Sequence, residues 1–472
     1  MASFGTFFGI NVAVSAMQTA QQAQSVISNN LANASTPGYT EEVANIVEQL
    51  PFPPIPSSGP IVAGQVGQGS VVQSVQRQVD AYYNRTVRDN LSNSEGQSTL
   101  LANLNQLQGI LNEPTTSSIH SALDNFFASW QALSTQAQST AARQSVIQQA
   151  VNLSQTFNTI QNQMVTMVGN LDTAISGSSG SQVNEVNQYA SQINQLNQQI
   201  VKIIGSGQNP NQLLDQRGLL LNDLAKLGNM SYTENSNGSV DVVFGGVHIV
   251  STSPGFQTTS FTVQDATNVS NGTIWANEQG IQTAQSLIAE LGQLQSTLSY
   301  SINQQLEQGY QYNSSTTGTA NDLFAVSTQN VTTGNTTTAV TTMSVVSGFT
   351  PQQLAAAGSV NSPGDGTNAQ TIATMQNLAT LQDSGGTSLG ATPDGFYSAL
   401  ITGLGAKTNA VSQQSTTASA LLQQSQSLQQ SVSGVNIDQE TAKMVEFQNI
   451  YNASAKFVSI QNQMIQTLIQ EV

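Results

Sequence analysis

The sequence predicts a mainly α-helical protein with inserted β structure, built from discontinuous domains whose N- and C-terminal helices pair as a coiled coil. Three patterns support this fold class. Apolar residues recur at helical spacing near both chain ends. Amphipathic helical patterns fill most of the interior and indicate a helical-bundle domain. One central stretch instead alternates apolar and polar residues, which is typical of a small outer antiparallel β domain.

The N-terminal pattern predicts a helix over residues 1–34. Gln24 occupies one slot of its stripe, and the apolar members are Ile10, Ala13, Met17, Ala20, Ile27 and Leu31. The helix is expected to end at Thr36-Pro37-Gly38, because proline cannot continue a helix and glycine supplies positive φ.

The C-terminal pattern is an apolar heptad repeat made of Ile437, Met444, Tyr451, Val458, Ile465 and Val472. The side chains of Ile450, Phe457 and Met464 lie one position earlier and widen this stripe. A heptad repeat packs against a partner helix, and neither terminal stripe has a partner within its own segment. We therefore expect the two ends to pair. The residues predicted to form this assembly seam are Ile10, Met17, Ile27, Leu31, Ile437, Met444, Phe447, Tyr451, Phe457, Val458 and Ile465.

The interior divides into helical and β patterns. Residues 49–70 are rich in proline and then glycine, which predicts an extended connector. Helical patterns cover about 73–204 and 281–308. Between them, β-forming residues alternate with polar ones over 230–263, and Asn237-Gly238 is a strong hairpin signal.

The last third begins with a Thr-, Asn- and Gly-rich stretch over 313–364, where we expect exposed loops and weak strands such as Met343–Val346. Helical patterns resume near Gln370 and run from Phe396 to the end, interrupted at Gly434. The predicted domains are a terminal helical domain (1–48 with 434–472), a helical rod-like domain (49–228 with 281–312 and 365–433), a small β domain (229–280) and the loop-rich segment 313–364, whose assignment to the outer β region stays open.

Composition excludes several classes of function. The chain has 472 residues, of which only 8% are charged, and a net charge of −16. This balance argues against binding to nucleic acid or to an anionic membrane. The absence of cysteine excludes disulfides and thiolate metal sites. No apolar run is long enough for membrane insertion, and no cleaved signal peptide is visible, so export would need another route.

Catalytic motifs are also missing from the sequence. His120 and His248 lie in different predicted domains without neighbouring histidines, which argues against a metal site. Neither a zinc-protease helix motif nor a nucleophile elbow occurs. Asp215 and Arg217 could act as an acid–base pair, but a helix-end salt bridge between them is the favoured interpretation. We therefore expect no enzyme activity and no cofactor.

Specific motifs resemble known proteins. Residues 28–40 resemble the signature of bacterial flagellar axial proteins, and the axial signature residues are Asn29, Asn30, Asn33, Pro37, Gly38 and Tyr39. Residues 433–456 resemble the matching C-terminal motif of that superfamily. Within it, the order of the central motifs resembles the hook-associated protein 1 (FlgK) family, whose central motif here is Leu213, Leu214, Asp215, Gln216 and Arg217. Departures include Glu41, and Gln429-Gln430 where the family often has arginine.

The resemblance implies a structural adaptor at the hook–filament junction. It implies self-association into a ring, contacts with the hook protein and with a second junction protein, and an extracellular location reached through the flagellar type III apparatus. It also implies a cytoplasmic chaperone for the C-terminal helix, with Ile450, Phe457, Val458, Met464 and Ile465 as binding candidates. Two alternatives stay open: a hook or rod axial protein, and a flagellin-like filament subunit.

Overall fold

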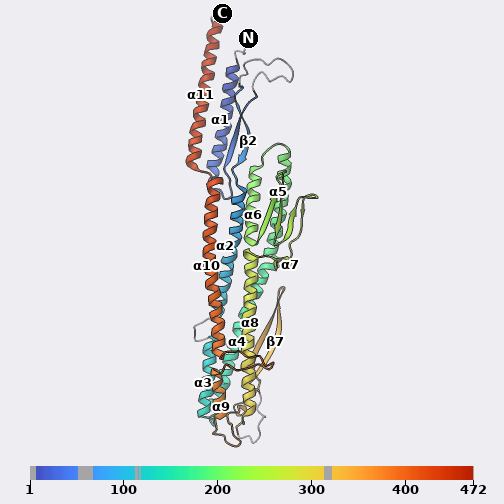
Figure 1. The fold of residues 1–472 in the computed structure, drawn as a ribbon, viewed down its shortest axis with the longest axis vertical. Coiled ribbons are helices and arrows are strands. Elements are labelled where there is room, and N and C mark those ends of the chain that lie inside the picture. Colours follow the sequence, from blue (N-terminus) through green and yellow to red (C-terminus); the bar gives the residue numbers. More distant parts are fainter. Residues whose placement is uncertain (1–6, 51–66, 112–114, 116–117, 313–321, 471–472) are drawn as a thin grey trace.

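A computed structural model describes residues 7–50, 67–111, 115, 118–312 and 322–470 (Figure 1). The molecule is an elongated rod, and the helices nearest to the two chain ends lie side by side at one end of it (Figure 1). The predicted connector over 49–70 lies mostly outside the described residues.

The terminal unit consists of helices α1 (Phe8–Asn33) and α11 (Ile437–Gln470) with strands β1 (Glu42–Glu48) and β2 (Ser70–Arg77). The helices run antiparallel, and the two-stranded antiparallel sheet packs against α1. The hydroxyls of Ser15 and Thr19 donate to the Ser70 carbonyl at 2.6 and 2.9 Å, which fixes β2 on the helix. The prediction that helical structure begins near residue 73 is wrong, because β2 continues to Arg77.

The body of the rod is a bundle of long helices. Several begin where a serine or threonine side chain accepts a hydrogen bond from a backbone N–H of the first turn, as Ser118, Ser139, Ser181 and Thr392 do. Pro393 follows Thr392 at the first helical position, where its missing N–H costs nothing. The body helices are α2 (Ala81–Leu111), α3 (Ile119–Thr135), α4 (Thr140–Ser176), α5 (Gln182–Gly205), α6 (Asn211–Leu227), α8 (Gly272–Gln308), α9 (Thr367–Thr374) and α10 (Pro393–Ser433).

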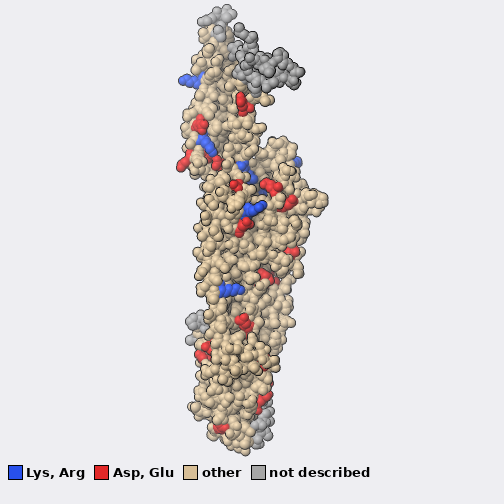
Figure 2. All heavy atoms as spheres, viewed as in Figure 1, with Lys and Arg blue, Asp and Glu red and all other residues tan. Residues whose placement is uncertain are grey.

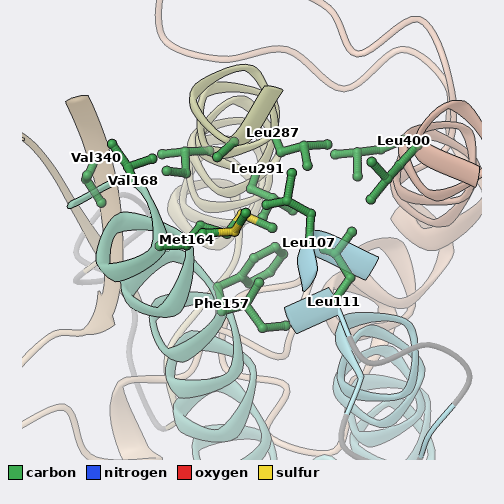
Figure 3. Packing of buried hydrophobic residues seen from close by; sticks show 14 of the residues in the cluster. Leu107, Leu111, Phe157, Met164, Val168, Leu287, Leu291, Val340 and Leu400 are labelled. Atoms are coloured by element: carbon green, nitrogen blue, oxygen red, sulfur yellow. The ribbon is translucent and has the colours of Figure 1, made fainter. Parts of the chain in front are cut away.

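The core of the body is formed by apolar side chains from helices far apart in the sequence. Leu107 of α2, Phe157 of α4 and Leu291 of α8 are fully buried and point toward one another (Figure 3). Full burial of such a side chain stabilises the fold by about 1.5–3 kcal/mol. The core is large without any residue of α1 or α11, so the body does not depend on the terminal helices for its packing.

Two β units are attached to the body. The first is a four-stranded antiparallel sheet in sequence order, and Gly238 with φ +82° in its first turn confirms the predicted hairpin. Helix α7 (Val263–Ala266) follows it, and α8 begins at Gly272 rather than near residue 281. The strands of this sheet are β3 (Met230–Glu234), β4 (Val240–Phe244), β5 (Val247–Ser251) and β6 (Gln257–Thr258).

The second β unit is a hairpin of β7 (Phe324–Thr333) and β8 (Thr336–Val345) that packs on both α4 and α8. Only loops and weak strands were expected here, and the structure instead forms ten paired residues on each strand. Burial of Val340 and Met343 against the helices explains how a threonine-rich segment is held in a regular hairpin.

One type of contact recurs wherever a described β unit meets a helix. An asparagine on the helix donates from Nδ2 to the carbonyl of one residue and accepts with Oδ1 from the N–H of the same residue, at 2.8–3.3 Å. We call these contacts asparagine clamps. The described residues contain the pairs Asn30–Glu42, Asn158–Met343, Asn187–Phe261, Asn197–Val240 and Asn303–Phe324.

Candidate assembly site at the joint of the chain ends

The terminal unit meets the body at a joint formed by the axial signature loop, the start of α6 and the residues that link α10 to α11. A cleft opens there, and most of the residues that line it come from the segments 34–41, 214–222 and 429–439. Charged side chains gather around this junction on the face shown in Figure 2, whereas most of the remaining face is uncharged. Charged side chains are few in this chain, and many of those visible on this face lie at the joint.

Asn30 is the central side chain of the axial signature, and it is 1% exposed. Its Nδ2 donates to the Glu42 carbonyl at 2.8 Å and to Glu440 Oε2 at 2.7 Å. Its Oδ1 accepts from the Glu42 N–H at 3.0 Å and from the Tyr39 hydroxyl at 2.8 Å. Both donor hydrogens and both acceptor positions of the amide are used, so this one residue links α1, the signature loop, β1 and α11.

The other signature residues shape the loop. Asn33 Nδ2 donates to the Asn29 carbonyl at 3.0 Å, and Asn29 Nδ2 donates to Glu42 Oε2 at 3.2 Å. Burial, followed by the carboxylates of Glu42 and Asp215, raises the pKa of Tyr39 above its usual value, so the phenol stays a neutral donor.

Pro37 and Gly38 form the turn that leaves α1. The Tyr39 N–H donates to the Thr36 carbonyl at 3.1 Å, which closes the turn around Pro37. Gly38 has φ +77°, and a Cβ at this position would lie 2.5 Å from Leu219 Cδ2 of α6. Glycine is therefore required both by backbone conformation and by the close approach of α6.

A carboxylate–ammonium network ties the signature loop to α11. Lys443 Nζ lies 2.7 Å from Glu440 Oε1 and 2.9 Å from Glu41 Oε1. The Glu41 N–H donates to the Ser433 carbonyl, at the end of α10, at 2.9 Å. Although burial opposes it, hydrogen bonding to Glu440 and Glu41 raises the pKa of Lys443 above its usual value, so this side chain is protonated at neutral pH.

The central motif anchors the joint through Asp215. Its Oδ1 accepts from Arg77 NH1 at 2.8 Å and from the Thr40 hydroxyl at 2.9 Å. The predicted salt bridge between Asp215 and Arg217 is wrong, because residues two apart on a helix point to different sides. Arg217 instead pairs with Glu234 at 3.2 Å. Leu213 and Leu214 are half-buried and Gln216 is exposed.

Arg217 faces the β3–β4 hairpin and is 4% exposed. Its NH1 donates to Asn197 Oδ1 at 3.1 Å and to the Gly238 carbonyl at 2.6 Å. Burial is the main cause that lowers the pKa of Arg217 to about 10, and repulsion from Arg77 and Arg88 acts in the same direction. The side chain is still protonated at pH 7, and it holds the hairpin against α5 and α6.

Most of the predicted seam residues are buried or half-buried, and two are exposed. Ile27 is buried, and the half-buried members are Ile10, Met17, Leu31, Met444, Phe447, Tyr451, Val458 and Ile465. Ile437 and Phe457 are 57% and 43% exposed, although the Phe457 ring lies beside Gly9 of α1. From Met444 onward, one apolar stripe of α11 is half-buried, and the neighbouring stripe is largely exposed except where Phe457 touches α1.

The chaperone candidates fall on both stripes. The side chains of Ile450, Phe457 and Met464 are 38%, 43% and 54% exposed, whereas Val458 and Ile465 are half-buried. Both sets remain candidates.

Several residues of the joint had no predicted role. Glu440, Lys443, Thr40 and Arg77 have partners that are distant in sequence, and only the spacing of Glu440 and Lys443 hinted at their ion pair. Within the described ranges, no group of histidine and carboxylate side chains is arranged to hold a metal ion. A search of the same residues found no helix with the length and hydropathy needed to cross a membrane.

Comparison with protein families supports the resemblance of the motifs. The family model described as the helical domain of flagellar hook-associated protein FlgK matches residues 104–324. A model for flagella basal body rod proteins matches residues 10–40, and a model for the C-terminal region of FlgEFG basal body rod proteins matches residues 417–471. The first of these two matches contains most of α1 and the whole signature 28–40, and the second contains α11.

Individual proteins agree with the family models. The chain is 29% identical over 233 residues to flagellar hook-associated protein 1 of Bacillus subtilis, which covers 49% of this chain and 45% of that protein. It is 28% identical over 233 residues to the Salmonella typhimurium protein of the same name, covering 40% of that protein. The matched region thus spans less than half the length of these relatives.

The fold also resembles a solved structure. The flagellar hook junction protein FlgK from Burkholderia pseudomallei superimposes with a TM-score of 0.59 at 16% identity, over 74% of this chain and 100% of that chain. At this identity the likeness concerns the fold alone. The helical-domain model and the named relatives independently show that the chain is similar to the flagellar hook-associated protein 1 (FlgK) family.

Proposed function

We propose that this protein is a structural subunit of the bacterial flagellum, a hook-associated adaptor that joins hook to filament, and that it is not an enzyme. One observation carries the proposal. The two chain segments that match flagellar rod-protein models fold into one terminal unit, and that unit leaves an apolar stripe of α11 exposed. An exposed apolar stripe of this kind is typical of a surface that another protein covers.

The partners we infer are other copies of the chain and axial proteins, bound through apolar and amide side chains rather than through ion pairs. Each chain carries −16, and subunits in a ring bring like charges together. Contacts made by apolar and amide side chains avoid this repulsion, and the exposed surface of α11 offers both. We infer a ring of identical subunits between the hook protein and a second junction protein, outside the cell.

Before assembly the same stripe would need protection. We infer that a cytoplasmic export chaperone covers Ile450, Phe457 and Met464, and that the subunit leaves through the flagellar type III apparatus. A groove that accepts one apolar helix face suits such a stripe. Val458 and Ile465 would become available to the chaperone once α11 leaves α1.

The proposed role is tested by deletion and complementation in the source bacterium. A deletion strain is expected to form hooks without filaments and to release filament protein into the medium. Complementation with Val458→Asp should fail, because a carboxylate would enter the packed side of α11. Ser459→Asp adds the same charge at an exposed position and should restore swimming. Filaments attached normally in the deletion strain would contradict the proposal.

A hook or rod subunit is the second candidate, since the models matched at both chain ends are named for rod proteins. The same deletion separates the two, because loss of a rod or hook subunit would remove the hook as well. The match of residues 104–324 to the FlgK helical domain favours the junction role over this alternative and over a flagellin-like filament subunit.

A further inference from the structure

Helix α11 has two adjacent apolar stripes, and its apolar pattern does not decide which of them faces α1. Met444, Tyr451 and Val458 form one stripe, and Ile450, Phe457 and Met464 form the other. Neighbouring residues are about 100° apart around a helix, so a rotation of α11 by about 100° would bring the second stripe against α1 and turn the first stripe away from it. Both stripes are apolar, so hydrophobic burial alone gives weak discrimination between the two orientations.

Charge pairing along the helix pair does not decide the orientation either. Coiled coils commonly fix orientation and register through ion pairs that flank the seam. Helix α1 runs from Phe8 to Asn33 without a single charged side chain, so it offers no such partner to α11. Any polar contact by which α1 itself selects a face of α11 must therefore come from one of its neutral side chains.

Asn30 and Glu440 supply that group and its partner. Among the described side chains of α11, Glu440 is the only buried one, and it is 1% exposed. It lies on the same face as Met444 and Phe447, and its Oε2 accepts from Asn30 Nδ2 at 2.7 Å. Lys443 and Glu41 complete the site at Oε1.

We propose that the Asn30–Glu440 hydrogen bond is an orientation key that selects which apolar stripe of α11 packs on α1 and which is offered to other proteins. Rotation of α11 would take the Glu440 carboxylate away from Asn30 and leave the amide with an unsatisfied donor in a buried site. A single buried polar contact can specify helix pairing in this way, because only one arrangement satisfies it.

The link from this key to assembly rests on the proposed function, but the key itself is a property of the folded chain. The natural sequence has no cysteine, so single cysteines report local accessibility without background. Met444→Cys probes the stripe that faces α1, and Ile450→Cys probes the stripe that faces solvent. The rate of maleimide labelling is measured at each position in the full chain.

In the otherwise unchanged protein, Ile450→Cys should react several-fold faster than Met444→Cys. Adding Glu440→Ala should raise the rate at 444 and lower the rate at 450, because rotation moves the two positions in opposite directions. Glu440→Gln retains an acceptor for Asn30 and should keep the original ratio. Glu446→Ala removes an exposed carboxylate from the same helix and is the matched control.

Two results would overturn the proposal. Unchanged rates in Glu440→Ala would show that the orientation is set elsewhere. A rise at both positions would show that Glu440 holds the helix in place rather than selecting its face. Either result leaves the junction role standing, whereas normal swimming of the deletion strain would refute that role without affecting the labelling result.

Discussion

Replacing Arg217 with methionine is expected to destabilise the body of the rod. Arg217 is 4% exposed and joins three parts of the fold through Asn197, Gly238 and Glu234. Methionine fills most of the volume of the arginine stem but donates no hydrogen bond. The substitution therefore tests the polar contacts and leaves the packing largely intact.

The size of the effect follows from the exposure of each partner. The contact with Glu234 is worth under about 1 kcal/mol, because that carboxylate is 55% exposed and screened by water. Loss of the donor to the Gly238 carbonyl costs about 1–3 kcal/mol, and loss of the charged hydrogen bond to Asn197 adds a similar amount. Since such terms are not additive, we expect a total of roughly 2–4 kcal/mol.

Urea unfolding of the full chain measures this loss through tryptophan fluorescence, since Trp130 and Trp275 both lie in the body. Glu234→Gln is the control, and it should cost less than about 1 kcal/mol. If Arg217→Met lowered the free energy of unfolding by no more than Glu234→Gln does, the buried contacts of Arg217 would not be what holds the β3–β4 hairpin.

Four further outcomes are expected. Gly38→Ala should loosen the joint, seen as faster hydrogen exchange in α1 and α11 but not in α4, because a Cβ there would meet Leu219 at 2.5 Å. Deleting the residues after 434 should abolish binding of a flagellar export chaperone in a pull-down; retained binding would place the chaperone site elsewhere. Moderate salt should strengthen self-association in sedimentation experiments by screening repulsion between chains of charge −16, and weaker association would indicate ion-paired contacts. The folded-state pKa values of Tyr39 and Lys443 are both raised, so their stabilising contribution is complete below pH 10 and is lost as the pH rises further. Exchange protection of α1 should therefore fall above pH 10, and Tyr39→Phe should reduce this pH dependence.

Periodicity in the sequence was sufficient to predict the terminal helices and the long helices of the body. It failed for β7, because Phe324 is the only buried side chain of that strand and the threonines beside it show no apolar alternation. It also missed β2, whose short alternating pattern runs directly into the helical pattern of α2. Local patterns identify an element only when one of its faces is consistently apolar.

The joint could be predicted only in part. The motif resemblance marked Asn30 and Asp215, but their partners Glu440 and Arg77 lie 410 and 138 residues away in the chain. Contacts over such distances depend on how whole elements pack, which local spacing does not encode. The asparagine clamps were missed for another reason: a polar residue within a helical pattern is ordinarily assigned to the solvent-facing side.

The asparagine clamps determine which chemical changes can release the β units from the helices. An amide group carries no charge, so neither pH in the ordinary range nor salt should release a strand that an asparagine holds. Hydrolysis of the amide is different, because a carboxylate would then present only acceptors to the carbonyl that Nδ2 had bound. At Asn197 the new carboxylate would face the Val240 carbonyl 2.8 Å away. Hydrolysis of single asparagine amides would therefore loosen the β units on this rod, while its apolar core stayed folded.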